Sequence, residues 1–319
     1  MTMPGNYAFL FPGQGSQAIG MMAELSREFP VVGNRFQEAS NVLKFDLWEL
    51  VSDGPIERLN ATENTQPALL AASVATWDIW SECGDHLPSI LCGHSFGEYS
   101  ALVCAGAITY QDAVTLVATR GKLMQESSPD GKGGMAAVIG LPKELLEDIC
   151  KAVSSIGICD CANFNAPGQI VISGEKSAVA KACEQAKAAG AKRALELPVS
   201  VAAHSRLMVP AAEAFMEHLS SIEIRSPKIP VVHNVDVKPH LDPTEIRSVL
   251  KQQLYSPVKW DSTVEYLADL GYTDCYECGP GKVLTGLVKR SETSMNCIPL
   301  GTSDVIKSEN KIKATIGPK

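Results

Sequence analysis

Short apolar runs alternate with helical patterns along most of this chain, and no other feature constrains its fold as strongly. The apolar runs at residues 7–11 and 89–92 are predicted strands, and apolar spacing predicts helices at 66–80, 98–105 and 109–126. Strands that alternate with helices in this way form a parallel sheet covered by helices. The predicted fold class is therefore α/β.

A stretch of turn-forming residues, 127–134, interrupts this alternation. After it the sequence predicts strands at 135–139, 158–162, 169–173 and 193–197, and helices at 143–153 and 177–189. Their order along the chain is that of the ferredoxin-like β-α-β-β-α-β unit. We therefore predict that residues 131–198 form a ferredoxin-like α+β subdomain inserted into an α/β core of residues 1–130 and 199–319. A substrate cleft is expected between the two.

Charge and cysteine content exclude several classes of protein. Acidic residues outnumber basic ones by 36 to 28, and the net charge of −8 argues against binding to nucleic acid or to an anionic membrane. No apolar run approaches the ~18 residues of a membrane span, and no secretory signal opens the chain. Cys275 and Cys278 form a C-x-x-C pair, but on a predicted strand they point to opposite faces. We therefore expect ten reduced thiols in a cytoplasmic protein and no metal site.

The glycine-rich segment Gly13-Gln14-Gly15-Ser16-Gln17-Ala18 follows the first predicted strand and is predicted to open a helix. It matches the dinucleotide-binding pattern, which also needs a second strand that ends in an acidic residue about 20 positions later. Residues 31–43 have a helical pattern instead, which disfavours nucleotide binding. What remains is a tight turn at a helix N-terminus, where backbone N–H groups and the Gln14 side chain can face an anion.

The segment Gly93-His94-Ser95-Phe96-Gly97 lies between a predicted strand and a predicted helix. A G-x-S-x-G sequence in that context is typical of a nucleophile elbow, in which the serine side chain projects from a strained turn. We therefore predict that Ser95 is a nucleophile and that the Phe96 N–H faces the oxyanion formed there. An ordinary tight turn is the alternative.

A nucleophilic serine needs a base near neutral pH, and the chain has six histidines. His204 is the best candidate because it follows the apolar run 199–203, which is predicted to be a strand. The carboxyl ends of strands build the sites of open α/β sheets. His233 lies within a predicted strand, where a buried and hydrogen-bonded ring is expected. No Asp or Glu stands out as a partner that orients His204.

Arg120 has apolar residues at all four positions three and four residues away in its predicted helix. Its guanidinium is therefore expected to face inward, where it needs an anion. An internal ion pair would meet that need, and so would a substrate carboxylate held in a bidentate clamp.

Together these segments resemble the malonyl-CoA:acyl-carrier-protein transacylases of type II fatty-acid synthesis, in the same order from about Phe9 to Arg290. The matching motifs are Phe11-Pro12-Gly13-Gln14-Gly15-Ser16-Gln17, Gly93-His94-Ser95-Phe96-Gly97-Glu98-Tyr99-Ser100-Ala101-Leu102, Arg120-Gly121, Ala162-Asn163-Phe164-Asn165, His204-Ser205, Asn234-Val235-Asp236-Val237, Gln253-Leu254-Tyr255-Ser256-Pro257-Val258 and Gly279-Pro280-Gly281-Lys282-Val283-Leu284.

The resemblance implies an α/β-hydrolase-like core and a dyad in which Ser95 accepts the acyl group and His204 is the base. It also implies roles for five further residues. The backbone carbonyl of Gln253 would replace the missing acid, the N–H groups of Gln14 and Phe96 would form the oxyanion hole, Arg120 would grip the malonyl carboxylate and Asn163 would contact the substrate. The substrates would be malonyl-CoA and acyl carrier protein, with no cofactor and no metal, and we expect a monomer.

Two departures from the family pattern bear on acyl selectivity. Ala202-Ala203 stands where the family commonly has Pro-Ser before the base, and Phe96 replaces the commoner Leu. Polyketide-synthase acyltransferase domains have His-Ala-Phe-His or Tyr-Ala-Ser-His at the base, and neither occurs here. An acyltransferase of a polyketide pathway and a serine thioesterase or esterase are therefore kept as alternatives, although Arg120 and the missing acid argue against hydrolysis. Because carrier proteins are typically acidic, Lys192-Arg193 and Lys289-Arg290 are candidate docking residues.

Overall fold

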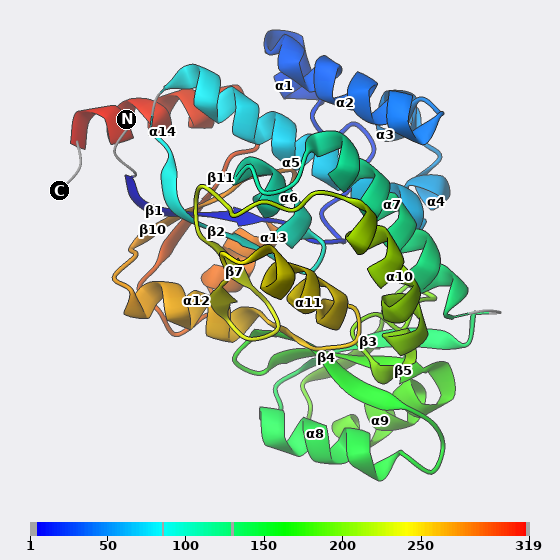
Figure 1. Ribbon diagram of the computed structural model, residues 1–319. Coiled ribbons are helices and arrows are strands. Elements are labelled where there is room, and N and C mark those ends of the chain that lie inside the picture. Colours follow the sequence, from blue (N-terminus) through cyan, green and yellow to red (C-terminus); the bar gives the residue numbers. More distant parts are fainter. Residues whose placement is uncertain (1–4, 85, 129–130, 317–319) are drawn as a thin grey trace.

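The computed structural model describes residues 5–84, 86–128 and 131–316, and the strands within them form two sheets (Figure 1). The larger sheet has the strand order β11 (Asn296–Pro299), β10 (Asp274–Glu277), β1 (Gly5–Phe11), β2 (Pro88–Gly93), β7 (Val231–His233) and β8 (Lys238–Pro239). Its strands are parallel from β11 to β7, and β8 runs antiparallel to β7. The predicted α/β class with a parallel sheet is confirmed.

Helices lie around the larger sheet, some packed directly on it and others on neighbouring helices. They are α1 (Ala23–Glu28), α2 (Pro30–Leu43), α3 (Leu47–Asp53), α4 (Ile56–Leu59), α5 (Thr62–Cys83), α6 (Gly97–Cys104), α7 (Tyr110–Glu126), α10 (Val209–Ser221), α11 (Pro243–Gln253), α12 (Trp260–Asp269), α13 (Val283–Val288) and α14 (Ser303–Ile316). Along β1, Phe9 and Phe11 pack into the core that α2, α5, α6 and α7 share. Ala8 and Leu10 point the other way, to the core against α12 and α13. Because both faces are buried, the central strands β1 and β2 are mostly apolar.

The smaller sheet has the order β6 (Arg193–Glu196), β3 (Gly133–Ile139), β5 (Gln169–Glu175), β4 (Cys159–Ala166) and β9 (Val258–Lys259). Its helices, α8 (Lys143–Ala152) and α9 (Lys176–Ala188), pack on it through a separate apolar core. From β3 to β6 the elements follow the predicted β-α-β-β-α-β order. β9 comes from outside residues 131–198, yet it pairs with β4 at Asn163 and Phe164. The placement of the subdomain boundaries at residues 131 and 198 therefore stays a prediction.

Two local predictions are wrong. Residues 199–203, predicted as a strand, belong to no helix or strand. Val201 and Ala202 are buried, and the Ala202 N–H donates to Ser128 Oγ (3.2 Å). The run is therefore apolar because its side chains are buried, although its backbone pairs with no strand. Apolar runs this short do not distinguish the two cases. The helix predicted to open at residues 13–18 begins only at Ala23, so the turn there is not a helix N-terminus.

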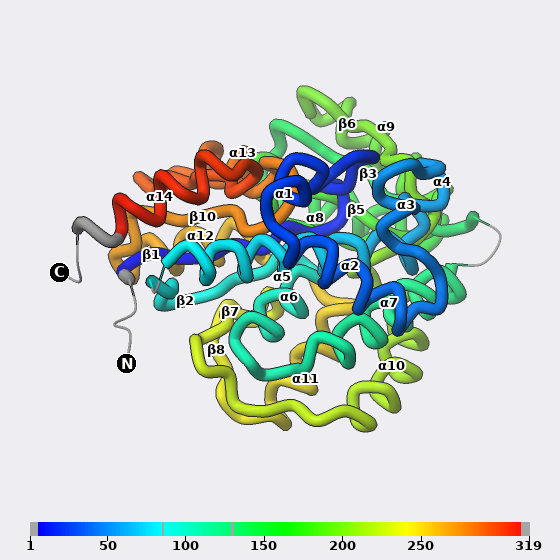
Figure 2. The backbone as a smooth tube through the Cα atoms, turned by 90° about the horizontal axis from the view of Figure 1, so that it is seen from above, coloured from blue at the N-terminus to red at the C-terminus, as the bar shows by residue number. Residues whose placement is uncertain are grey.

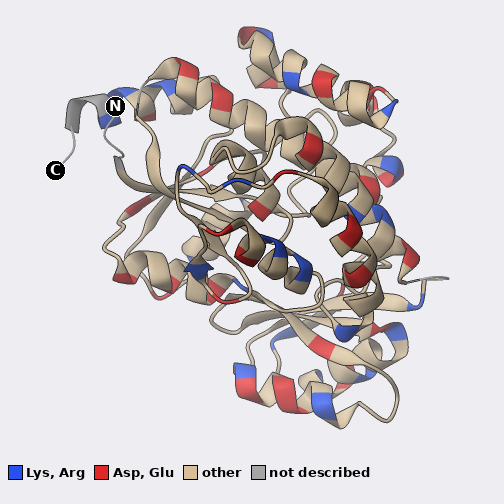
Figure 3. Ribbon diagram, in the orientation of Figure 1, with Lys and Arg blue, Asp and Glu red and all other residues tan. Residues whose placement is uncertain are grey.

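The surface carries charges of both signs. Basic and acidic residues are mixed along α8 and α7, as Figure 3 shows, whereas β1 and β2 carry none. Helices α2, α5 and α7 pack against one another beside the larger sheet (Figure 2). Within the described part of the chain, no helix is both long and apolar enough to cross a bilayer.

Candidate active site

Ser95 lies in the turn between β2 and α6, as predicted. Its φ of 53° is in the left-handed region, which costs a residue other than glycine about 1–3 kcal/mol. Gly93 and Gly97, two residues before and after Ser95, let the backbones of the strand and the helix pass close together. A Cβ at Gly97 would lie 2.4 Å from the Phe11 carbonyl oxygen, and one at Gly93 would lie 2.0 Å from the Gly97 carbonyl carbon. The strand–turn–helix geometry of a nucleophile elbow is therefore present.

His204 reaches the serine from a different part of the chain. Its Nε2 lies 2.7 Å from Ser95 Oγ, and its Nδ1 lies 2.7 Å from the carbonyl oxygen of Gln253. Because a carbonyl oxygen can only accept, the ring proton sits on Nδ1 and leaves Nε2 free to accept from the serine hydroxyl. His204 is also in the left-handed region (φ 61°), in a turn held by its N–H donating to the Leu254 carbonyl (3.0 Å).

Burial lowers the pKa of His204 to about 3, and the nearby charge of Arg120 is the next largest cause. The residue is 3% exposed. The imidazole is therefore neutral, and able to act as a base, throughout the physiological pH range.

Arg120 lies on α7 and is 1% exposed, so the inward orientation predicted from its apolar neighbours is confirmed. Its Nη1 donates to Gln66 Oε1 (3.0 Å), and its Nη2 donates to Gln253 Oε1 (3.0 Å) and to Ser95 Oγ (3.3 Å). Burial lowers the pKa of this guanidinium. Its two side-chain amide partners are neutral, so its positive charge remains available to an anion that enters the site.

A cavity of about 360 Å³ joins these groups. Of the predicted site residues, it is lined by Gln14, Ser95, Phe96, Arg120, Asn163 and His204. Gln253 lies behind His204, where its backbone carbonyl holds the ring. The rest of the lining is largely apolar and comes mainly from the smaller sheet, from the segment after β6 and from α13, including Met135, Val171, Leu197 and Leu287. All seven predicted residues thus meet at one site.

Sequence reasoning assigned no role to three residues that contact the predicted ones or the turn beside them. Gln66 accepts from Arg120, and its only signal was its position at the start of a predicted helix. Asn165 Oδ1 accepts from His94 Nε2 (2.8 Å), which links β4 to the residue before Ser95. Asn234 Oδ1 accepts from the Ser95 N–H (2.7 Å). Both asparagines lie in motifs that matched, but a motif does not say which atoms they bond.

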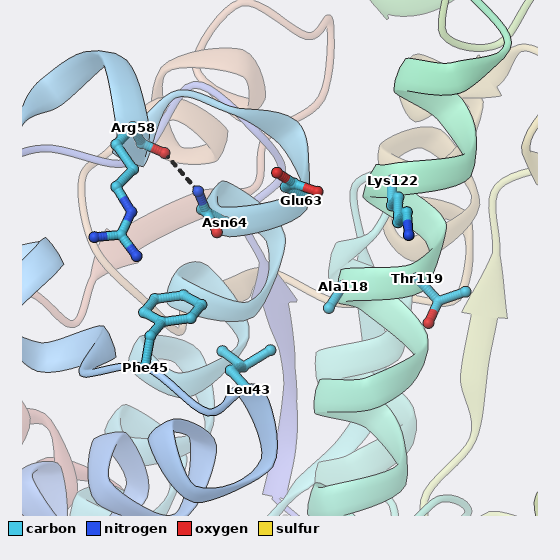
Figure 4. Close-up of a pocket in the computed structure, with 8 residues that line it drawn as sticks. All are labelled: Leu43, Phe45, Arg58, Glu63, Asn64, Ala118, Thr119 and Lys122. Atoms are coloured by element: carbon cyan, nitrogen blue, oxygen red, sulfur yellow. Dashed lines mark hydrogen bonds between the residues drawn. The ribbon is translucent and has the colours of Figure 1, made fainter.

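A second hollow, of about 410 Å³, lies on the other side of the contact between α5 and α7 (Figure 4). It is lined by Leu43, Phe45, Arg58, Glu63, Asn64, Ala118, Thr119 and Lys122. None of these residues lines the first cavity, and none of them is a serine, cysteine or histidine, so we assign the chemistry to the cavity at Ser95.

Comparison with known proteins identifies the family. The chain matches the acyl transferase domain over residues 8–313. Over 284 residues it is 53% identical to the malonyl CoA-acyl carrier protein transacylase of Salmonella typhimurium, covering 89% of this chain and 92% of that protein. The chain belongs to the malonyl CoA-acyl carrier protein transacylase family. The Bacillus subtilis transacylase is 44% identical over 301 residues, which are 94% of this chain and 95% of that protein.

Solved transacylase structures share the fold. That of Coxiella burnetii has a TM-score of 0.95 and 46% identity, and the match covers 98% of each chain. A malonyl-transacylase in complex with a type II PKS acyl-carrier protein has a TM-score of 0.94 and 51% identity, covering 96% of this chain and 99% of that one. The resemblance expected from the motifs and the predicted class of enzyme, an acyltransferase, are confirmed. The roles of individual residues stay predictions.

Proposed function

We propose that this transacylase moves a malonyl group from malonyl-CoA to the phosphopantetheine thiol of acyl carrier protein, through an ester on Ser95. One observation carries the proposal. Ser95 Oγ lies within hydrogen-bond reach of a neutral imidazole (2.7 Å) and of a guanidinium whose side-chain amide partners are neutral (3.3 Å). The imidazole activates the hydroxyl, and the guanidinium favours an acyl group that ends in a carboxylate.

In the first half-reaction, His204 Nε2 takes the hydroxyl proton as Ser95 Oγ attacks the thioester carbon. The N–H groups of Gln14 and Phe96 hold the oxyanion, and losing one such donor typically costs about 3 kcal/mol. When the intermediate collapses, the C–S bond breaks and the coenzyme A sulfur takes the proton from His204. The carboxylate of the malonyl group stays paired with Arg120, while Asn163 contacts the acyl chain from β4.

In the second half-reaction, the phosphopantetheine thiol gives its proton to His204 and attacks the ester carbon. The C–O bond then breaks, and Ser95 regains its proton from His204. One thioester has replaced another, so the equilibrium constant is near unity and no energy source is required. Each proton and electron pair is accounted for by protein side chains and the two substrates, without a cofactor.

The test is the fate of the acyl group on Ser95. Intact mass of the wild-type chain after mixing with malonyl-CoA is expected to show one malonyl adduct, which Ser95→Ala abolishes. Malonyl-CoA consumption should depend on added carrier protein. An adduct that persists in Ser95→Ala would overturn the proposed nucleophile, and equal consumption without carrier protein would favour the alternative, a thioesterase.

The physiological setting is part of the proposal. We place the enzyme in the cytoplasm, which its ten free cysteines support because thiols stay reduced there. We place it in fatty-acid synthesis, the setting of the family that its motifs resemble, with a polyketide carrier protein as the alternative. Comparing holo carrier proteins of the two kinds as acceptors decides between them, since the preferred one has the higher kcat/KM.

A further inference from the structure

The side chain of Asn234 bridges the two ends of the nucleophile elbow. Its Oδ1 accepts from the Ser95 N–H (2.7 Å) and its Nδ2 donates to the Gly93 carbonyl oxygen (2.8 Å). The residue is fully buried, directly after β7. Because one bond needs an acceptor and the other a donor, a carboxamide of this length meets both needs, and an aspartate would meet only one.

Glu98 holds Asn234 from the other side. Its Oε1 accepts from the Asn234 N–H (2.6 Å), and its Oε2 accepts from His233 Nδ1 (3.0 Å). Both Glu98 and His233 are fully buried, as the strand pattern predicts for the histidine. Glu98 lies on α6, three residues after the nucleophile. The contacts therefore close a ring from Ser95 along α6 to Glu98, across to Asn234, and back to Ser95.

This ring bears on the chemistry through the peptide planes beside Ser95. Asn234 fixes the N–H on one side, and Gln253 Nε2 donates to the Ser95 carbonyl oxygen (2.9 Å) on the other. In a trans peptide the N–H points opposite to the C=O, so fixing the Ser95 carbonyl also aims the Phe96 N–H. Ser95 is strained (φ 53°), and a strained residue persists only where its surroundings hold it.

We propose that Asn234 and Glu98 are positioning residues that hold the elbow so that Ser95 Oγ and the Phe96 N–H meet at the acyl carbon, with Glu98 acting through Asn234. This inference rests on the proposed nucleophilic role of Ser95. It adds a buried carboxylate and a carboxamide to the machinery, neither of which lines the cavity.

The first test separates positioning from folding. Asn234→Ala is expected to slow single-turnover formation of malonyl-Ser95 about 10²-fold, with KM for malonyl-CoA changed less than about threefold, because about 1 Å of misplacement suffices for such a loss. Asn310→Ala is the matched control. Asn310 on α14 is also buried and donates to the Trp80 carbonyl oxygen (2.9 Å), but it does not line the cavity. The control is expected to acylate at the wild-type rate.

If Asn234→Ala does not fold, Asn234→Asp gives the same test, because it keeps the acceptor for Ser95 and loses the donor to Gly93. A folded Asn234 variant that acylates within about threefold of wild type, or whose loss lies in KM alone, would overturn the inference. The rate at which an uncharged fluorophosphonate modifies Ser95 gives a second readout that needs no malonyl-CoA. Absence of a malonyl adduct on the wild-type chain would count against the proposed function instead, and the fluorophosphonate rates would still test the positioning.

The second test asks whether Glu98 acts through Asn234. Glu98→Ala combined with Asn234→Ala should lose no more activity than Asn234→Ala alone, since residues of one network are not additive. Additive losses would overturn that step. Glu98→Gln keeps an oxygen for the Asn234 N–H, so its amide must donate to His233 Nδ1. The His233 proton should then move to Nε2, which ¹⁵N NMR detects, while acylation falls less than tenfold. An unchanged His233 tautomer would contradict the assigned hydrogen bond.

Discussion

Arg120 contacts Ser95, the proposed nucleophile, so we expect this one residue to affect both acyl selectivity and reactivity. Its Nη2 donates to Ser95 Oγ (3.3 Å), while Gln66 and Gln253 fix the rest of the guanidinium. In the free enzyme the hydrogen-bond partners of this guanidinium are neutral, namely two side-chain amides and the Ser95 hydroxyl. A malonyl carboxylate would supply the missing negative charge, and an acetyl group would not. We therefore expect selectivity for a diacid to come from the amides, in place of carboxylates, that bond to the arginine.

Replacing Arg120 tests this selectivity. Arg120→Ala is expected to lower kcat/KM for malonyl-CoA by about 10²-fold or more, because a buried charge-assisted pair contributes roughly 3 kcal/mol or more. Acetyl transfer, which makes no such pair, should fall far less. The measurement is the ratio of malonyl to acetyl adduct formed on Ser95 from the two donors. Equal losses for both donors would rule out the clamp.

The same substitution has a second consequence, in the pH dependence. Burial and then the Arg120 charge lower the pKa of His204 to about 3, so the basic form of the wild-type imidazole is retained as pH falls from 7 to 5. Removing the positive charge raises the pKa of His204. The rate of Ser95 modification by an uncharged phosphonate should thus fall at a higher pH in Arg120→Ala than in wild type. Superimposable profiles would show that the charge does not act on the base.

At the scale of elements, the contact between α5 and α7 sets the position of Arg120. Gly121 packs directly on the first turn of α5, and a Cβ there would lie 2.6 Å from both Glu63 Cα and the Thr62 carbonyl oxygen. Thr62 and Arg120 line the catalytic cavity, whereas Glu63 and Lys122 line the hollow on the other side (Figure 4). This helix pair therefore separates the two hollows, and its spacing is determined by a residue with no side chain.

Gly121→Ala is expected to destabilise the protein by about 1–3 kcal/mol, the usual cost of overpacking, because backbone cannot give way as a side chain can. It should also raise KM for malonyl-CoA as α7 shifts. Gly33→Ala is the control, since Gly33 is an exposed helical glycine with open space around it. There the substitution should stabilise by about 0.4–1 kcal/mol. Urea unfolding of both variants measures the contrast, and a shift of the same sign in both would contradict the packing argument.

Periodicity predicts elements well where burial follows a regular spacing, and fails where it does not. Strand β1 and helix α7 were found because alternate residues, or every third and fourth, face a core. The run 199–203 was mistaken for a strand because its side chains are buried without pairing to a neighbour. The helix after the glycine turn was placed too early because turn residues 12–22 are partly apolar. An apolar run indicates that a segment is buried. It indicates a strand or a helix only where the burial follows a regular spacing.

For the whole molecule, the class of fold followed from the sequence but the pairing of distant strands did not. β9, at Val258–Lys259, joins the smaller sheet beside β4, about 100 residues earlier in the chain. The candidate site likewise has residues that the local sequence indicates and residues that it does not. Ser95 could be named from its G-x-S-x-G turn, and His204 from the apolar run before it, although that run is not a strand. Gln66, which accepts from Arg120, and Asn234, which accepts from the Ser95 N–H, could not, because hydrogen bonds between residues far apart leave no periodic signal.

Docking of carrier protein is the remaining question at this scale, because both proteins are acidic. The net charge of −8 opposes approach of an acidic partner, so a local basic patch has to guide it. Lys289 and Arg290 are exposed at the end of α13, which lines the cavity. Lys192 and Arg193 are exposed at the start of β6, and Leu197, just after this strand, lines the cavity too.

Reversing these charges should therefore weaken docking and leave the chemistry intact. Glutamate at both residues of either pair is expected to raise KM for carrier protein about fivefold or more at low salt, with the difference shrinking at high ionic strength because exposed charges are screened. Formation of malonyl-Ser95 from malonyl-CoA should be unchanged. Lys151→Glu with Lys181→Glu is the control, since these exposed lysines lie on α8 and α9 and make the same change in net charge. If the control raises KM as much as the α13 and β6 variants, net charge governs the encounter and the two proposed pairs have no special role.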